Sequence, residues 1–175
     1  MAAPLPAAET FDWSAAPARF SPPGTDWERQ RVQSAGLQGV RFLRAGAFIT
    51  VAEYTSLMKR HARIDERGRT EFAIPRPGFT IDDVVDRVRF DPEAKPPWVK
   101  IRDRRDGERE IDGHAARAVD YVWDDKGKTR RGREYYVVSR GHLYVARFRG
   151  SLEDLMLFEQ VVESLEFPAP VKDAV

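Results

Sequence analysis

The stretch that decides the fold covers residues 133–150 and reads REYYVVSRGHLYVARFRG. Residues 135–138 are apolar at every position, and the part that follows Gly141 is nearly as apolar. In a strand, neighbouring side chains point to opposite faces of the sheet. Two such strands, joined at Gly141, therefore predict a sheet whose two faces are both shielded from water.

Other segments show the alternation of strands and are separated by turn signals. The turn signals are Ala45–Gly46, Asp106–Gly107 and Asp112–Gly113. The expected strands are residues 39–43, 47–54, 98–104, 108–111, 115–123, 133–140 and 143–148. Because most of these strands are joined by short turns, we expect a mostly antiparallel sheet of about six to seven strands.

Three helices are predicted beside the sheet. The last begins at Ser151, which can cap it, with Asp154 three positions on and an apolar stripe behind it. Residues 80–89 carry a second stripe after Thr80, and a thinner one predicts a short helix over residues 55–67. The prediction is an α/β fold of the α+β kind, an α/β/α sandwich with the C-terminal helix packed on the sheet.

Composition limits the possible classes of protein. A chain of 175 residues with 42% hydrophobic residues predicts one domain, residues 11–167, between tails at 1–10 and 168–175. The chain has no cysteine, which excludes disulfides, thiolate catalysis and cysteine-based zinc sites. The formal net charge of +1 makes nucleic acid an unfavoured partner, and no apolar run is long enough to predict a membrane span.

The first ten residues, MAAPLPAAET, are small and include two prolines. They lack the basic start and apolar stretch of a signal peptide, but they are typical of the start of a processed exported protein or of a short tether. We therefore expect an exported protein, periplasmic or lipoprotein-like, with a cytoplasmic protein as the equal alternative.

Three short pieces resemble the PsbP-like family, whose members include the extrinsic PsbP protein of photosystem II, bacterial DcrB-like proteins and a Ran-binding nuclear-transport factor. The pieces are Pro23, Gly24 and Trp27; residues 112–116 (DGHAA); and Val162, Ser164, Leu165 and Phe167 in and after the closing helix. The resemblance extends from Phe11 to Phe167 and implies an α/β/α sandwich. It also implies a protein that binds other molecules, since the family has no shared catalytic centre.

The histidines His61, His114 and His142 lie on different predicted elements, without the spacing that prepares a metal site. We expect no metal and no cofactor; His114 and His142 are weak candidates, in case adjacent strands bring them to Asp120 or Asp124. No nucleophile elbow or glycine-rich phosphate loop occurs, and Ser139 is interpreted as a turn residue.

Residues 124–133, DDKGKTRRGR, concentrate positive charge at a predicted hairpin tip. The candidate partner-binding residues are Trp123, Lys126, Lys128, Arg130, Arg131 and Arg133. Such a tip can dock on an acidic partner, but charged tips also occur simply because they keep sheet edges from aggregating.

The hypothesis for function is a non-enzymatic binding or adaptor domain of the bacterial cell envelope, with an unknown protein partner. One alternative is a small hydrolase or isomerase with His114 or His142 as general base in a cleft between sheet and helix. A second alternative is a domain that binds an anionic partner, lipid or nucleic acid, through the basic hairpin of residues 126–133.

Overall fold

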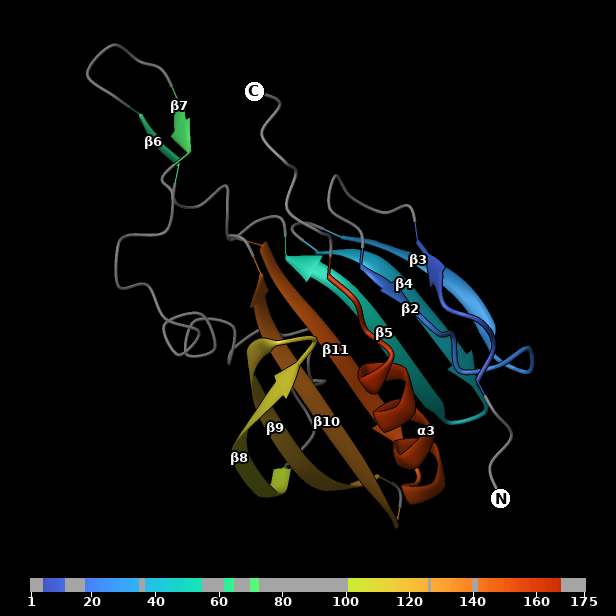
Figure 1. The fold of residues 1–175 in the computed structure, drawn as a ribbon. Helices are drawn as coiled ribbons and strands as arrows, with labels where there is room; N and C mark the ends of the chain where they lie inside the picture. Colours follow the sequence, from blue (N-terminus) through green and yellow to red (C-terminus); the bar gives the residue numbers. More distant parts are fainter. Residues whose placement is uncertain are drawn as a thin grey trace.

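The structure, a computed structural model, describes residues 5–11, 18–34, 37–54, 62–64, 70–72, 101–125, 127–139 and 142–167. The elements are β1 (Glu9–Thr10), β2 (Arg19–Phe20), β3 (Glu28–Ser34), β4 (Leu37–Arg44), β5 (Ala47–Tyr54), β6 (Ala62–Ile64), β7 (Thr70–Phe72), β8 (Ile101–Ile111), β9 (His114–Asp125), β10 (Lys128–Ser139), β11 (His142–Gly150) and the helix α3 (Leu152–Glu163). Seven strands form one sheet in the order β3-β4-β5-β11-β10-β9-β8, and α3 lies across one face of it (Figure 1).

Every neighbouring pair in the sheet is antiparallel. Strands β3–β5 form one meander and β8–β11 another, and the pairing of β5 with β11 joins them. The turn between β8 and β9 is made by Asp112 and Gly113, both with positive φ (48° and 73°), the conformation that two-residue hairpin turns favour. The predicted α+β class with an antiparallel sheet is confirmed.

The closing helix forms where the sequence predicts it. Ser151 accepts a hydrogen bond from the backbone N–H of Asp154, and the Asp154 side chain accepts one from the backbone N–H of Ser151. Phe158, buried on the inner side of α3, stacks on Tyr135 and Phe148 with ring centroids 5.9 and 5.5 Å apart. Burying an aromatic side chain of this size contributes roughly 1.5–3 kcal/mol, so this contact fixes the helix on the sheet.

Both faces of the sheet contain buried side chains, as predicted. The face under α3 holds a cluster built around Phe20, Phe42, Phe148 and Phe158. The opposite face, called the far face below, holds a second buried cluster that includes Tyr121, Trp123, Tyr136 and Val145. The helix predicted over residues 80–89, which would cover one face, lies outside the described residues.

Two local predictions are wrong. The helix expected over residues 55–67 is contradicted at Ala62–Ile64, which form β6 and pair with β7, because the thin apolar stripe gives a helix little to bury. The turn expected at Asp106–Gly107 does not exist: β8 continues from Ile101 to Ile111, since β9 offers it partners along this length. An Asp-Gly pair makes a hairpin only where the flanking strands pair with each other.

Candidate functional site

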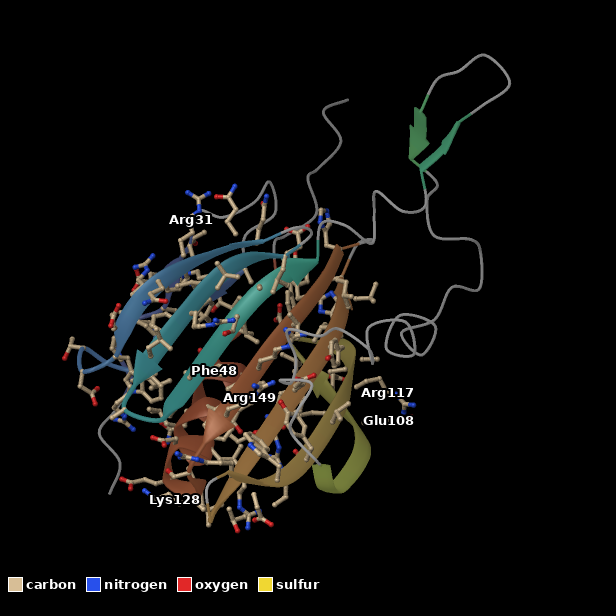
Figure 2. All side chains as sticks on the ribbon, turned by 180° about the vertical axis from the view of Figure 1, so that it is seen from behind. Arg31, Phe48, Glu108, Arg117, Lys128 and Arg149 are labelled. Carbon is tan, nitrogen blue, oxygen red and sulfur yellow. The ribbon has the colours of Figure 1, made fainter. Side chains whose placement is uncertain are left out.

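Two arginines and two aromatic rings form a row across the far face, which we call the arginine row: Arg41, Phe48, Arg149 and Trp123. The guanidinium carbon of Arg41 lies 5.1 Å from the centroid of the Phe48 ring. That of Arg149 lies 5.3 Å from the same ring and 5.6 Å from the Trp123 ring. Figure 2 shows Phe48 and Arg149 next to each other on this face. Cation–π contacts at these distances restrain both guanidinium groups.

The row follows from strand alternation. On β11, Phe148 points toward α3, so Arg149 points to the far face. Phe48 on β5 is the direct cross-strand partner of Arg149. Arg41 on β4 stands opposite Thr50, and its Nε donates a hydrogen bond of 3.0 Å to Thr50 Oγ1. Four strands thus place the row on a rigid surface.

Tyr121 reaches this row because Gly132 has no side chain. The two residues are cross-strand partners on β9 and β10, and a Cβ atom at position 132 would stand 2.3 Å from two atoms of the Tyr121 ring. The ring stacks on Trp123 with centroids 5.4 Å apart. The Tyr121 hydroxyl lies 3.1 Å from Glu134 Oε1 and 3.4 Å from Arg149 Nε.

Glu134 is a buried carboxylate on the same face, and other groups occupy its oxygens. Oε1 accepts from Tyr121 and lies 3.5 Å from the Nε of Arg147, while Oε2 accepts from the hydroxyl of Tyr136. Burial first, and then the charge of Glu134, raise the pKa of Tyr121, so this phenol stays protonated and donates. The negative charge of Glu134 thus compensates Arg147.

Arg149 keeps one charged donor unmatched. Its Nη2 is buried, and among the described residues it has no hydrogen-bond acceptor. In the described part of the chain, its Nε has one long contact, 3.4 Å to the Tyr121 hydroxyl. A buried donor without an acceptor costs about 1–3 kcal/mol, and more when it is charged. Native proteins contain few such groups, and each one calls for an explanation.

Two of the predicted partner-binding residues lie at the arginine row. Trp123 is part of the arginine row and is buried. Arg130, its cross-strand partner, lies beside the β4–β5 turn, where its Nη1 donates to the carbonyl oxygen of Gly46 at 3.4 Å. The basic segment of the sequence therefore contributes to the arginine row from one side.

Lys128 and Arg131 are exposed, and Lys126 lies outside the described residues. The expectation of a basic loop is wrong in its extent, because β9 runs to Asp125 and β10 starts at Lys128. Only a short turn joins them, so residues 128–133 belong to a strand. Their side chains alternate between the two faces of the sheet instead of gathering at one tip.

Arg133 faces α3, and its donors are already used. Its Nε and Nη2 lie 2.5 and 2.9 Å from the two carboxylate oxygens of Asp120, and its Nη1 lies 2.9 Å from Glu159 Oε1. The hydrogen bonds that Arg133 donates to Asp120, and then the one it donates to Glu159, outweigh burial and raise the pKa of Arg133. Glu159 also accepts from Tyr135 at 3.0 Å and from Arg109 at 2.5 Å. This network connects α3 to the sheet.

His114 and His142 lie on the two strands that flank β10, on either side of Ser139. His142 Nδ1 lies 2.5 Å from Oε1 of the buried Glu53. The expected carboxylate partners of these histidines are elsewhere, since Asp120 binds Arg133 and Asp124 accepts from Thr129. Within the described ranges, no group of three or more potential ligands is arranged to hold a metal ion.

Ser139 and His114 have the connectivity of a nucleophile and its base. His114 Nδ1 lies 2.7 Å from the carbonyl oxygen of Asp112, which makes that nitrogen the donor, and its Nε2 lies 3.0 Å from Ser139 Oγ. However, Ser139 is only 2% exposed. A substrate carbonyl therefore cannot reach the hydroxyl in this conformation, and the pair serves to join the ends of β9 and β10.

Sequence reasoning missed Arg41, Phe48 and Arg149. A usable signal was present, because positions 147 and 149 alternate arginine with the apolar residues of a strand that the sequence marks as buried on both faces. An arginine at such a position needs a partner on the shielded face. The identity of its neighbours depended on the pairing of β11 with β5, which the sequence does not reveal.

The comparisons with known proteins bear on the fold. The solution structure of cyanobacterial PsbP (CyanoP) from Synechocystis sp. PCC 6803 matches with a TM-score of 0.54 and 16% identity, and the match covers 86% of each chain. This chain has a PsbP-like fold. The buried Trp27 and Phe167 and the Asp112–Gly113 turn, which carried the resemblance, are packing and turn residues of this fold.

Other solved structures with a similar arrangement are LpqN of Mycobacterium tuberculosis, involved in cell envelope biogenesis, and PA94 of Pseudomonas aeruginosa, of unknown function. LpqN matches at 14% identity and a TM-score of 0.48 over 89% of this chain and 87% of its own. PA94 matches at 17% identity and a TM-score of 0.44, over 94% of this chain and 99% of its own. No protein-family model and no curated protein matches this chain. In the described residues, no helix is long and apolar enough to cross a bilayer.

Proposed function

We propose that this PsbP-like domain is a non-enzymatic binding domain that contacts an acidic protein partner through the arginine row. The observation that carries the proposal is that two partly exposed arginines, Arg41 and Arg149, are held over the Phe48 and Trp123 rings on one face of the sheet. A guanidinium keeps its proton throughout the physiological pH range, so it binds anions and does not act as an acid or base. The arginine row is therefore suited to binding an anionic group and not to catalysing a reaction.

Charge and ring contacts favour a protein over nucleic acid as the partner. With a formal net charge of +1 the chain lacks the long-range field that draws in a polyanion. Single-stranded nucleic acids bind sheet faces by stacking bases on aromatic rings, but guanidinium groups already lie over Phe48 and Trp123. An acidic protein, in contrast, presents separate Asp or Glu carboxylates, and each of these can bind one arginine.

The proposal includes a location in the bacterial cell envelope. LpqN is involved in cell envelope biogenesis, and we propose that this chain also acts in the envelope. Fractionation of the native host with an antibody to this protein tests it. We expect recovery with the envelope fraction, and recovery with a cytosolic marker enzyme would contradict this part of the proposal.

Capture from the native host, followed by binding of the purified partner, tests the proposed function. The bait is the wild-type domain or the double variant Arg41→Gln/Arg149→Gln, and the matched control is Arg31→Gln/Arg131→Gln, which removes two exposed cations. We expect the double variant alone to lose the partner, which should be acidic. Equal capture by all three baits, or a substrate turned over by the wild-type domain in an activity screen, would refute the proposal.

A further inference from the structure

We propose that the outer strand β8 is a self-association surface, to which a second copy of this chain adds its own β8 in antiparallel orientation. This surface is separate from the arginine row and does not depend on the proposed function. Three features of β8 support the pairing: its place in the sheet, the exposure of its residues, and the order of its charges along the strand.

β8 is one of the two outer strands of the seven-stranded sheet, and among the described residues it pairs with β9 only. Figure 1 shows it at the margin of the sheet. An outer strand has a row of backbone N–H and C=O groups that can pair with a strand of another chain. β8 has 11 residues and the other outer strand, β3, has seven. β8 therefore offers the longer edge for such pairing.

The second half of β8 is accessible to another molecule. Gly107, Glu108 and Glu110 are exposed, and Arg109 is partly exposed. The side chain of Glu108 is 81% exposed, although its Oε1 lies 2.8 Å from Nη1 of Arg117. An exposed ion pair of this kind contributes little to stability. Glu108 can therefore turn to a cation of a second chain at little cost.

The charges of β8 are complementary to the same strand in reverse. The seven residues centred on Asp106 read DRRDGER. In an antiparallel pair with two-fold symmetry, each contact between unlike positions occurs twice, once on either side of the axis. If the axis passes Asp106, Arg104 of one copy stands opposite Glu108 of the other. In the same register, Asp103 stands opposite Arg109.

This register brings opposite charges together at most of its charged positions. The two contacts of opposite charge each occur twice, which gives four in the dimer, against one contact of like charge between the two copies of Asp106. Opposite charges placed directly across two strands stabilise their pairing. The register of β8 against β9 shifts between Ile101 and Asp103, so the pairing is inferred from Asp103 onward. The product is one continuous sheet with both α3 helices on the same face.

Charged residues on an outer strand usually prevent pairing with another chain, and β3 has this property. Opposed residues in a symmetric antiparallel pair point to the same face, so they are an even number of positions apart. Glu28 of β3 therefore cannot stand opposite Arg29 or Arg31 in such a pair. The order of the charges, and not their number, distinguishes β8 from β3.

Sedimentation equilibrium of the full-length protein at increasing concentration tests the pairing. We expect a reversible monomer–dimer equilibrium that weakens when sodium chloride is added. Glu108→Arg places like charges opposite each other at two positions and should weaken dimerisation at least about tenfold. The charge swap Arg104→Glu/Glu108→Arg restores opposite charges and should return dimerisation to within about threefold of the wild type. Arg31→Glu, an exposed change on β3, is the matched control and should dimerise as the wild type does.

A wild-type protein that stays monomeric up to about 1 mM would overturn the inference. A dimer that Glu108→Arg does not weaken, or that the charge swap does not restore, would also overturn it. Thermal unfolding of each variant shows whether it is folded.

The contact between the two copies of Asp106 gives a readout that removes no attractive pair. Asp106→Asn abolishes the repulsion at the axis and should tighten dimerisation by about two- to fivefold. An unchanged or weaker dimer in this variant would contradict the register.

Hydrogen exchange measured by NMR locates the contact independently. As the dimer forms, the β8 amides that do not face β9 should become protected from exchange, while those of β3 should exchange as they do in the monomer. Protection of β3 instead of β8 would show that the chain pairs through its other edge, and the inference would be rejected.

Discussion

The ring of Tyr121 lies directly over Gly132, so closely that a Cβ atom at position 132 would stand 2.3 Å from ring atoms. This contact between β9 and β10 lets the Tyr121 hydroxyl reach Glu134, and it places the ring against Trp123. The glycine in the RRGRE segment is thus required for side-chain packing on the far face.

The variant Gly132→Ala should lower the free energy of unfolding by about 1–3 kcal/mol, the usual cost of an overpacked core. The added methyl group must displace Tyr121 and with it the hydrogen bond to Glu134. Urea denaturation measures the loss. Gly107→Ala is the control, because its Cβ would lie 3.8 Å from Ala118 in ordinary contact; a comparable loss there would show that the tyrosine contact is not the cause.

The variant Glu159→Gln should lower the free energy of unfolding by about 1–2 kcal/mol, since two arginines and Tyr135 share its carboxylate. This expected loss is small for a shared carboxylate, because the Glu159 side chain is 23% exposed and solvent screens its charge. Glu163→Gln is the matched control one turn on, where the carboxylate makes a long 3.4 Å contact to Arg109. Equal destabilisation by both changes would argue against the network that connects α3 to the sheet.

The lowered pKa of Asp154 predicts that the protein loses stability in acid. Burial alone would raise the pKa of Asp154, but hydrogen bonds from Ser151 and Arg44 outweigh it and hold the pKa below its ordinary value of 3.8. A carboxyl with a lowered pKa in the folded state stabilises the protein above its unfolded pKa, and this contribution disappears as the pH falls through the folded value. The wild type should therefore be more stable than Asp154→Asn at pH 7.

That difference should stay constant down to about pH 5 and shrink below about pH 4. Thermal unfolding of both proteins from pH 7 to pH 3 measures it, and Glu153→Gln, an exposed change in the same helical turn, provides the reference. A difference that persists unchanged at pH 3 would show that packing, and not the charge of Asp154, stabilises the start of α3.

The variant Ser139→Ala should cost about 1 kcal/mol of stability and change no reaction rate. Its hydroxyl is closed off from solvent and bonded to His114, so its role is to hold the ends of β9 and β10 together. The measurements are urea denaturation and hydrolysis of a small activated ester. Hydrolysis by the wild type that is faster than in buffer, and that is abolished in this variant, would restore the hydrolase alternative.

The sheet and its closing helix were predictable because their signals are local. Residues 135–138 are apolar on both faces, Ser151 and Asp154 cap the helix, and Asp112–Gly113 has the chemistry of a two-residue turn. The errors arose where a local signal was overruled by a partner strand. Asp106–Gly107 continues a strand because β9 runs beside it, and Ala62–Ile64 pairs with β7.

The candidate site was only partly predictable. Trp123 and Arg130 were selected for their place beside a basic segment, and both lie at the arginine row. Arg149 and Phe48 meet only because β11 pairs with β5, two strands that are about ninety residues apart in the chain. No local pattern encodes such a pairing, so neither the ring contacts nor the unmatched donor could be derived beforehand.

The junction between β5 and β11 also has a kinetic meaning. Each meander forms through short hairpins, whereas the seam where β5 pairs with β11 joins strands that are far apart in the sequence. This pairing should therefore form late and limit the folding rate. Because Phe48 and Arg149 face each other across that seam, the recognition surface would come into existence only when the two halves of the molecule have assembled.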